Sequence, residues 1–301
     1  MRKAFVDSLS SQIDDHEKWL FITGDLGFMA LEKLQQKIGE RFINAGIAEQ
    51  NMVTIAAALA HEGFIPWIYS ISPFVTLRPY EQIRNNVCLH KLPVKIVGNG
   101  GGYGYGIMGA THHNIEDIGA MRILPNMVVY VPFTDSDIHD VVQLMNKDAN
   151  PNYLRLNTGA KIKQTIPPFQ QWRKIKEGKK AIVIGTGPVV ENIINSEFAE
   201  ELEIWIVGIF PVITIPDEII QSLNNSRKLI IVEEHTGQCS LRETISYLII
   251  NQLTTSIKIH SLSANGYPSG KYGDQLFHQI ENELAGEGLN TSIKKILDII
   301  V

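Results

Sequence analysis

The fold prediction starts from residues 41–52, Arg41-Phe-Ile-Asn-Ala-Gly-Ile-Ala-Glu-Gln-Asn-Met52. A short apolar run ends at Asn44, Gly46 turns the chain, and from Ala48 onward apolar residues recur at helical spacing. This order predicts a strand, a tight turn and a helix with Glu49 in its first turn. The helix dipole alone favours an acidic residue there, so the spacing by itself gives Glu49 no catalytic role.

The alternation of short apolar runs and amphipathic segments continues on both sides of this stretch. The predicted strands are Trp19–Thr23, Arg41–Asn44, Pro66–Tyr69, Val94–Val97, Met127–Val131 and Asn152–Leu156. The predicted helices between them are Ala48–His61, Phe74–Leu89, Ile115–Leu124 and Asp135–Asn146. Several of the strands are continuously apolar, which is typical of a parallel sheet covered on both faces. We therefore predict an α/β domain over residues 1–157.

The sequence after this domain first loses the pattern and then regains it. Residues 158–178 contain Pro167-Pro168 and show no clear period, so we interpret them as a linker that crosses the surface. Predicted strands then follow at Lys180–Gly185, Glu203–Gly208, Leu229–Glu233 and Ile257–Ser261, and a last helix near Thr291–Ile300. This indicates a second, smaller α/β domain over residues 179–301.

Composition limits the class of protein. Of the 301 residues, 44% are hydrophobic and 20% charged, as in a soluble globular protein, and the net charge of −5 without a basic block argues against nucleic acid or an anionic membrane as partner. Cys88 and Cys239 are far apart and are interpreted as buried free thiols in a reducing compartment. The first residues lack the apolar segment of a signal peptide, so the expected location is the cytoplasm.

The residue types in the stretch 41–52 also resemble a motif of a known family. Gly46-Ile-Ala-Glu-Gln50 resembles the G-I-A-E-Q signature of the transketolase and deoxyxylulose-phosphate synthase group. In that family the glutamate hydrogen-bonds the aminopyrimidine of thiamine diphosphate and so activates it, which implies that Glu49 is catalytic and that Ile47 helps to bind the cofactor. Asp25, in Gly24-Asp-Leu-Gly27, resembles the acidic residue that opens the family's pyrimidine-binding domain and is expected to shape the same pocket. An ordinary turn aspartate is the alternative.

The segment Ser72-Pro-Phe-Val-Thr-Leu-Arg-Pro-Tyr-Glu-Gln-Ile83 resembles the family's helix whose aromatic ring stacks on the pyrimidine. The resemblance implies that Phe74 is this ring. A core phenylalanine at a helix start is the interpretation that composition alone favours.

A glycine-rich stretch, residues 100–117, follows the strand that ends at Val97. Its glycines do not have the spacing of a dinucleotide-binding motif; they would let the backbone approach a ligand at the carboxyl end of the sheet. The run Gly109-Ala-Thr-His-His113 resembles the family's G-x-T-H-Q. This implies that His112 is catalytic and contacts the substrate, and that His113, in place of the usual glutamine, is a further substrate residue. Thr111 and Glu116 also match, and Glu116 is expected to be structural.

The resemblance extends over essentially the whole chain and implies a fold of two parts, a pyrimidine-binding domain followed by a transketolase C-terminal domain. The family holds the diphosphate through Mg²⁺ with a G-D-G motif on a preceding domain, and neither Gly24-Asp25 nor Gly273-Asp274 is followed by glycine. The expectation is therefore a split transketolase: an N-terminal partner subunit holds the diphosphate and most of the Mg²⁺, this chain supplies no metal ligand, and the assembly is α2β2.

Three departures from the family concern the substrate. Gly100 replaces a phosphate-binding histidine, Met108 replaces an aspartate that contacts a sugar hydroxyl, and Thr158 replaces a phosphate-binding arginine. Arg155 lies three residues before Thr158 and is a candidate substrate residue in place of that arginine. Losing a histidine and an arginine removes charge-assisted contacts to phosphate. We therefore expect a ketol transfer on an atypical sugar, one not bound through phosphate in the usual way.

Three other functions stay open. One is a decarboxylating enzyme that uses a 2-oxo acid donor, as in deoxyxylulose-phosphate synthase or the β subunit of a 2-oxo acid dehydrogenase. Another is a non-catalytic assembly or regulatory subunit, against which the presence of Glu49, Phe74 and His112 argues. The weakest is a nucleotide-binding module at Gly185-Thr-Gly187, because two glycines after a strand are common at turns.

Overall fold

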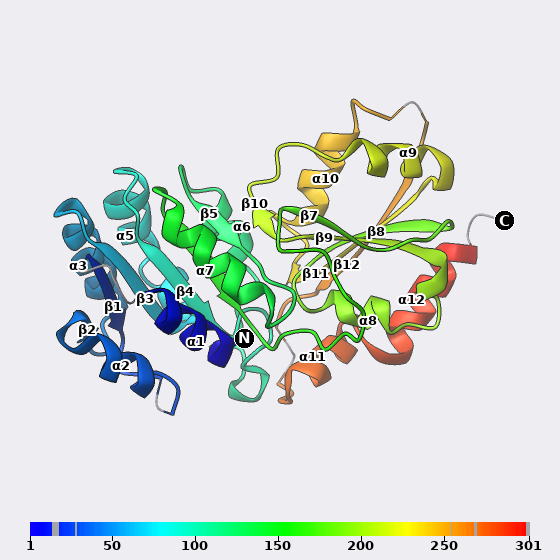
Figure 1. The fold of residues 1–301 in the computed structure, drawn as a ribbon. Helices are drawn as coiled ribbons and strands as arrows, with labels where there is room; N and C mark the ends of the chain where they lie inside the picture. The colour runs from blue at the N-terminus through cyan, green and yellow to red at the C-terminus, as the bar shows by residue number, and fades with distance from the viewer. Residues whose placement is uncertain (14–17, 28, 254, 268–269, 299–301) are drawn as a thin grey trace.

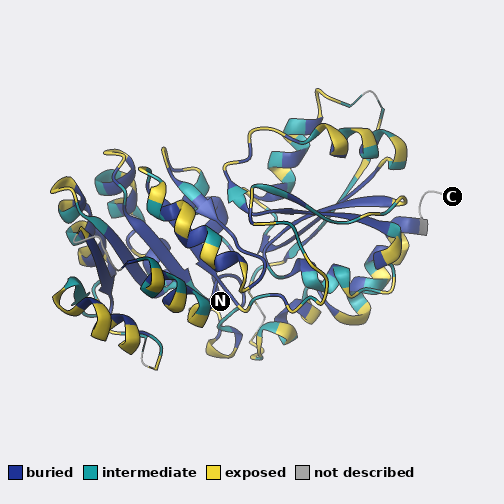
Figure 2. Ribbon diagram, viewed as in Figure 1, coloured by how far each residue is buried: buried dark blue, intermediate teal, exposed yellow. Residues whose placement is uncertain are grey.

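The computed structural model describes residues 1–13, 18–27, 29–253, 255–267 and 270–298, which form two α/β units side by side (Figure 1). Each unit is built around one sheet, and the apolar strands of both sheets are buried while the outer faces of the helices are exposed (Figure 2). The predicted α/β class and the order of the two units are confirmed. The exact domain boundaries stay a prediction.

The first sheet has seven strands in the order β10-β5-β6-β4-β3-β1-β2, parallel except for β10. Its strands are β1 (Trp19–Thr23), β2 (Phe42–Asn44), β3 (Ile65–Ile71), β4 (Lys95–Asn99), β5 (Val128–Tyr130), β6 (Asn152–Leu156) and β10 (Ile209–Phe210). In the register, Ile22 of β1 lies opposite Ile43 on one side and Ile68 on the other. All the parallel strands therefore end at one edge, which is where α/β proteins bind ligands.

Helices cover both faces of this sheet because its strands are apolar on both faces. One face is packed by α1 (Arg2–Gln12), α2 (Glu32–Ile38) and α7 (Asp137–Lys147). The other is packed by α3 (Glu49–His61), α4 (Ser72–Thr76), the π-helix η2 (Ile83–Cys88) and α6 (Asp117–Arg122), with the short α5 (Tyr80–Gln82) between α4 and η2. Two 3-10 turns, η1 (Gly39–Arg41) and η3 (Gly106–Met108), lie in the loops.

The second sheet has five strands in the order β12-β11-β8-β9-β7, parallel except for β7. Its strands are β7 (Trp172–Lys176), β8 (Ala181–Thr186), β9 (Leu202–Val207), β11 (Lys228–Thr236) and β12 (Lys258–Ala264). The remaining helices are α8 (Val190–Ile194), η4 (Ala199–Glu201), α9 (Asp217–Ser226), α10 (Leu241–Ile249), α11 (Gln275–Glu281) and α12 (Gly286–Asp298). Among the described residues, no helix has both the length and the apolar character required to span a membrane.

The structure departs from the sequence prediction in the continuity of one helix. The predicted helix Phe74–Leu89 is broken between α4 and α5, where Leu77, Arg78 and Pro79 intervene. A proline has no amide hydrogen to donate to the preceding turn, which favours a break at Pro79.

Two edge strands also depart from the prediction. Residues 172–176 of the predicted linker form β7, which pairs antiparallel with β9. The strand was not predicted because three of its five residues are basic, although charged residues are common on edge strands. The two-residue β10, which follows the second unit's β9, pairs with β5 of the first sheet.

Two smaller expectations also change. Cys88 is buried as predicted, but Cys239 is exposed, at a positive φ of 50°. The last predicted helix, Thr291–Ile300, belongs to the longer α12, and its final residues Ile299 and Ile300 lie outside the described residues.

Candidate active site

The carboxyl edge of the first sheet brings the predicted site residues together. Glu49 follows β2, Phe74 follows β3, Gly100 follows β4 and Thr158 follows β6. Because parallel strands end at the same edge, residues more than a hundred positions apart become neighbours there.

Glu49 begins α3 after the turn at Gly46, whose φ of +73° suits glycine. Its side chain is 2% exposed, and Oε2 accepts a hydrogen bond from Nη1 of Arg78 at 2.7 Å. A carboxylate so deeply buried requires a charged or polar partner, which Arg78 supplies.

Arg78 also covers the Phe74 ring, with its guanidinium carbon 4.3 Å from the ring centroid. The guanidinium is thus a planar N–H donor held between an aromatic face and a buried carboxylate. The sequence alone pointed to no role for Arg78. Its position four residues after Phe74, which places side chains on one face of a helix, was the available signal.

His112 lies beside this group. Its ring centroid is 5.1 Å from that of Phe74 and 6.4 Å from that of Tyr105, and Nδ1 lies 3.0 Å from the Thr111 hydroxyl. Partial burial lowers the pKa of His112 below its usual range, so the ring is neutral near pH 7 and can donate at one nitrogen and accept at the other.

His113 does not face the same space, contrary to its predicted contact with substrate. It is 2% exposed and packs edge-on against Tyr103 and His278, with ring centroids 5.1 and 4.8 Å away. His112 lies in a turn closed by a bond from its amide to the Gly109 carbonyl, whereas His113 precedes Asn114, which bridges to Gly102, so the two adjacent rings have different surroundings.

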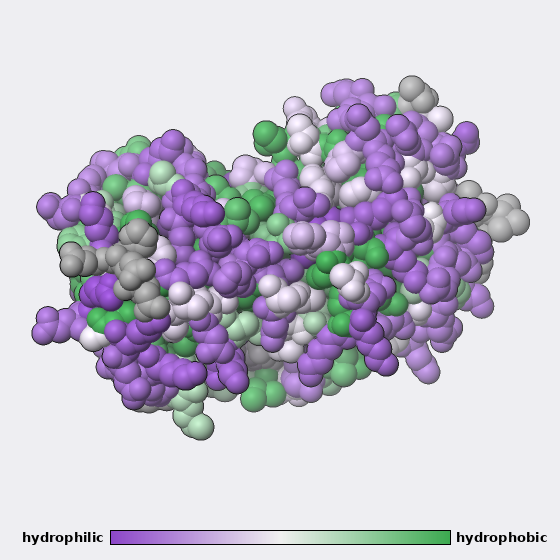
Figure 3. Space-filling model, in the orientation of Figure 1, coloured by the Kyte–Doolittle hydropathy of each residue, from purple (hydrophilic) through white to green (hydrophobic). Residues whose placement is uncertain are grey.

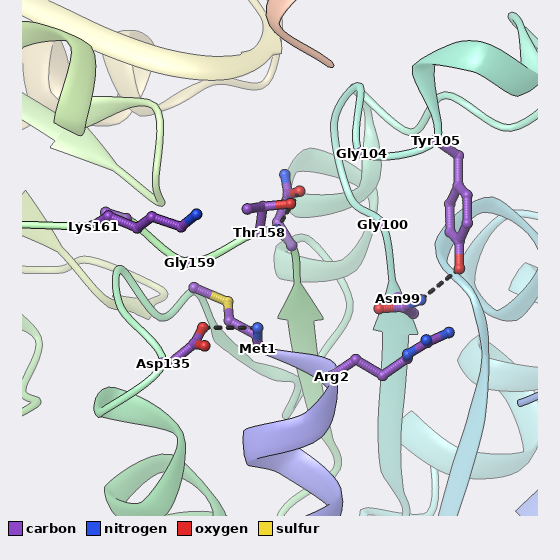
Figure 4. Close-up of a pocket in the computed structure, with 12 residues that line it drawn as sticks. Met1, Arg2, Asn99, Gly100, Gly104, Tyr105, Asp135, Thr158, Gly159 and Lys161 are labelled. Carbon is purple, nitrogen blue, oxygen red and sulfur yellow. Dashed lines mark hydrogen bonds and ion pairs between the residues drawn. The ribbon is translucent and has the colours of Figure 1, made fainter. Parts of the chain in front are cut away.

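A pocket of about 550 Å³ opens beside Tyr105 and is lined by Gly100 and Thr158, as shown in Figure 4. Two cationic side chains, Arg2 of α1 and Lys161, also line it. Tyr105 is fixed there because its hydroxyl accepts a hydrogen bond from Nδ2 of Asn99 at 2.5 Å. The other lining residues are Met1, Gly104, Asp135, Asn157, Gly159 and Ala160, and the Asp135 carboxylate is ion-paired with the amino group of Met1.

Arg155, predicted as a substitute phosphate ligand, is instead part of the interior. It is 3% exposed, and its Nε donates to Oδ2 of Asp117 at 2.8 Å. The same oxygen accepts from the hydroxyl of Tyr153 at 2.7 Å, and Nη2 of Arg155 donates to the carbonyls of Asn114 and Glu234. These contacts occupy the guanidinium, so Arg155 is unsuited to bind substrate.

The remaining predicted residues lie at the borders. Asp25, at a φ of +56°, exchanges hydrogen bonds of 3.0 Å with the Asn44 side chain and lines a separate pocket of about 240 Å³. Ile47 is 75% exposed next to Glu49, and Met108 is 53% exposed on η3. Glu116, expected to be structural, accepts a hydrogen bond from the hydroxyl of Tyr267. Within the described residues, no group of three or more His, Cys, Asp or Glu side chains is placed to hold a metal ion.

The face of the molecule shown in Figure 3 is mostly hydrophilic, with apolar side chains scattered among the polar ones. Scattered apolar residues are normal on a protein surface. This face therefore gives no indication of a membrane-binding surface.

Comparison with known proteins agrees with this geometry. A family model described as "Transketolase, pyrimidine binding domain" matches residues 1–161. The "Putative transketolase C-terminal section" of Methanocaldococcus jannaschii is 31% identical over 310 aligned positions, covering 98% of this chain and 96% of that protein. One subunit of the apulose-4-phosphate transketolase of Actinobacillus succinogenes is 26% identical over 240 positions, covering 76% of each.

Other relatives are longer. The 1-deoxy-D-xylulose-5-phosphate synthase of Clostridium perfringens is 28% identical over 278 positions, which cover 89% of this chain but 44% of that protein, so the chain spans less than half the length of such relatives. A solved structure described as "Split gene transketolase, inactive beta4 tetramer" superposes with a TM-score of 0.81 at 25% identity, covering 98% of this chain and 97% of the other.

Proposed function

Because this chain belongs to the transketolase family, we propose that it is the pyrimidine-binding subunit of a two-chain, thiamine-diphosphate-dependent transketolase. The observation that carries the proposal is the group formed by Glu49, Phe74 and Arg78. It pairs a buried carboxylate with an aromatic ring, and a planar N–H donor, the Arg78 guanidinium, bonds the carboxylate and covers the ring.

The aminopyrimidine of thiamine diphosphate would take the place of the Arg78 guanidinium. The Arg78 guanidinium is planar, lies on the Phe74 ring and donates to Glu49, which are the contacts that an aminopyrimidine ring requires. When bound, thiamine diphosphate supplies the carbon that takes up and passes on a two-carbon ketol unit. Arg78 is 44% exposed and can swing outward to make room.

Each residue then has a defined task. Glu49 holds a proton at the pyrimidine ring, and its burial excludes water that would compete for that proton. Phe74 orients the ring by stacking. Neutral His112, beside Phe74, orients the oxygens of the donor sugar by hydrogen bonding. Ile47 and Asp25 border the cofactor space.

The substrate we propose is a ketose with an anionic group held in an atypical way. Gly100 and Thr158 offer no charge, but Arg2 and Lys161 face the same pocket from two other elements, and Figure 4 shows them approaching it from opposite sides. Two cations in a pocket favour a phosphate or carboxylate on the substrate. This moves the anionic contact from the positions of Gly100 and Thr158 to Arg2 and Lys161.

We further propose that another chain supplies the half of the site that binds the diphosphate and Mg²⁺, in an α2β2 assembly. Supporting this, a relative that this chain matches over 76% of that protein's length is named as one subunit of a transketolase. Ile47 is also 75% exposed at the mouth of a buried carboxylate site, as expected where a second surface covers it.

A decarboxylating function with a 2-oxo acid donor is the second candidate, because the full-length relative from Clostridium perfringens is a 1-deoxy-D-xylulose-5-phosphate synthase. Release of CO₂ from pyruvate by the reconstituted enzyme separates it from ketol transfer. A non-catalytic subunit is the third candidate function, and it is supported by the similarity to a solved structure described as an inactive tetramer.

The test is calorimetric titration of thiamine diphosphate with Mg²⁺ into this chain alone, and into its mixture with the partner chain encoded beside it. Tight binding in the mixture alone supports the shared site, and ketose phosphates and 2-oxo acids are then compared as donors. Absence of binding in both samples contradicts the proposal and favours an assembly role.

A further inference from the structure

We infer that Glu234, in the second unit, is a positioning residue that sets the geometry of the substrate pocket in the first. Its carboxylate holds the glycine-rich loop of residues 100–109, and through that loop it acts on Tyr105 and His112. The kinetic part of this inference rests on the proposed function; the structural part does not.

Glu234 lies near the end of β11 and reaches across to the loop. Its side chain is 3% exposed, and Oε1 accepts a hydrogen bond from the backbone N–H of Tyr103 at 2.7 Å. The side-chain amide of Gln275 donates to both carboxylate oxygens, at 2.9 and 3.1 Å, and that of Gln279 donates to Oε2. The buried charge is thus satisfied by N–H donors from the loop and from α11.

The loop has glycine where the carboxylate approaches it. A Cβ added to Gly102 would lie 2.2 Å from Oε1 of Glu234, and the φ of +64° at Gly102 already disfavours other residues. Glu234 and the loop therefore fit each other only because position 102 has no side chain.

Further contacts hold the same loop to the second unit. The buried Tyr103 hydroxyl donates to the carbonyl of Gly266 at 2.8 Å, and its ring stacks on His278 with centroids 5.1 Å apart. Gly106 approaches the chain before α11 so closely that an added Cβ would meet the carbonyl oxygen of Gly273 at 2.7 Å. Glu234 is the charged member of this set and the one that binds a loop amide.

The held loop carries the groups that face substrate. Tyr105 lines the pocket that Arg2 and Lys161 also line, and the amide of His112 donates to the carbonyl of Gly109 at 2.9 Å. A shift of the loop would therefore move Tyr105 and His112 together, whereas Glu49 and Phe74 lie on other segments. Misplacing such groups by about 1 Å is enough to weaken productive substrate binding.

The first experiment is hydrogen–deuterium exchange on the full chain, comparing wild type with Glu234→Ala and Glu234→Gln. The alanine leaves the buried Tyr103 amide without its acceptor, so we expect exchange at residues 100–113 to rise by about tenfold or more. The glutamine keeps one acceptor oxygen and should give a smaller rise. If the alanine variant does not fold, the glutamine variant decides the same question.

Glu233→Gln is the matched control. Glu233 is the adjacent residue, is equally buried, and accepts from the amides of Leu241 and Arg242 at the start of α10 rather than from the loop. Its substitution should leave exchange at residues 100–113 unchanged. Unchanged exchange in both Glu234 variants would overturn the inference, as would an equal rise in the Glu233→Gln control.

The second experiment uses the enzyme reconstituted with its partner chain and a ketose phosphate donor that the wild type turns over. We expect Glu234→Ala to raise the donor KM by about tenfold while the affinity for thiamine diphosphate stays that of wild type. If donor KM and cofactor affinity change together, Glu234 is merely structural and the inference is wrong. If wild type neither binds cofactor nor turns over, the proposed function fails and the positioning role with it, whereas the exchange data still decide whether Glu234 holds the loop.

Discussion

Two regions at the carboxyl edge of the first sheet, here called the Glu49 end and the Glu234 end, are built in different ways. At the Glu49 end, formed by Glu49, Phe74 and Arg78, a buried carboxylate is paired with a side chain that is 44% exposed. At the Glu234 end, formed by the loop of residues 100–109 and Glu234, a carboxylate is held by donors from two separate segments. The chain therefore closes the Glu234 end with buried donors and the Glu49 end with a partly exposed arginine. A site that another molecule must enter is expected to be built like the Glu49 end, and a preorganised pocket like the Glu234 end.

Replacing Glu49 gives the largest expected effect and tests the Glu49 end. Glu49→Gln keeps an oxygen for Arg78 but cannot hold the proton, so turnover of the reconstituted enzyme should fall by about 10²–10⁴-fold. Steady-state assays measure this, and size-exclusion chromatography should show the assembly intact. Activity within tenfold of wild type would remove Glu49 from the catalytic site.

Replacing Asp117 tests the interior beneath the Glu234 end. Asp117→Ala leaves the Arg155 guanidinium buried without its ion-pair partner, so the free energy of unfolding should fall by about 3–5 kcal/mol. Denaturant titration measures the change. Glu177→Gln, which breaks an exposed pair with Lys174, should cost less than about 1 kcal/mol. Equal losses for the two variants would show that the interior pair is no stronger than a surface one.

Replacing Arg78 sharpens the comparison, because it removes the side chain that closes the Glu49 end. Arg78→Leu leaves the Glu49 carboxylate buried and unpaired, which should lower the stability of the isolated chain by about 1–3 kcal/mol. The loss should shrink when Glu49→Gln is also present, as a double-mutant cycle would reveal. Arg84→Leu is the control, since that arginine is exposed and bonds its neighbour Asn85. A loss that is the same with and without Glu49→Gln would show that the pair does not stabilise the chain.

The smallest expected effect is a pH dependence at Glu233, beside Glu234. Burial raises the pKa of Glu233 from 4.5 to about 7, so between these pH values the folded chain binds more protons than the unfolded chain. Its contribution to stability is present below pH 4.5 and is lost as pH rises through 7, by about 1 kcal/mol between pH 6 and 7. Thermal melts across this range should have a flatter pH profile in Glu233→Gln, and an unchanged profile would contradict the shift.

Much of the fold follows from local pattern. Continuous apolar strands alternating with amphipathic helices predict the parallel sheets, and the shared edge of those sheets explains why Glu49, Phe74 and His112 come together. Neither β7 nor β10 was predicted from the sequence. β7 is a charged edge strand, and β10 has two residues, which are too few to show a hydrophobic period.

The site was harder to predict where a role depends on a distant partner. Arg155 lies three residues before Thr158, where the family has a substrate-binding arginine. Its ion-pair partner Asp117, however, is 38 residues away in the sequence, and the pair is buried in the interior. Glu234 is 131 residues from Tyr103, and no local pattern joins them. His112 and His113 are indistinguishable by residue type, and only the folded structure separates His112, which lies beside Phe74, from His113, which is buried against Tyr103 and His278.

The short strand β10 has a consequence for how the molecule melts. It belongs to the second half of the sequence but adds its hydrogen bonds to β5 of the first sheet, and one apolar core runs through both units, joining Ile68 and Met52 to Phe210 and Trp205. The two halves therefore share a cooperative unit, and calorimetry should record one heat-absorption peak rather than two. A fragment ending at residue 161 would lose the strand that shields β5, and its bare backbone edge would invite aggregation.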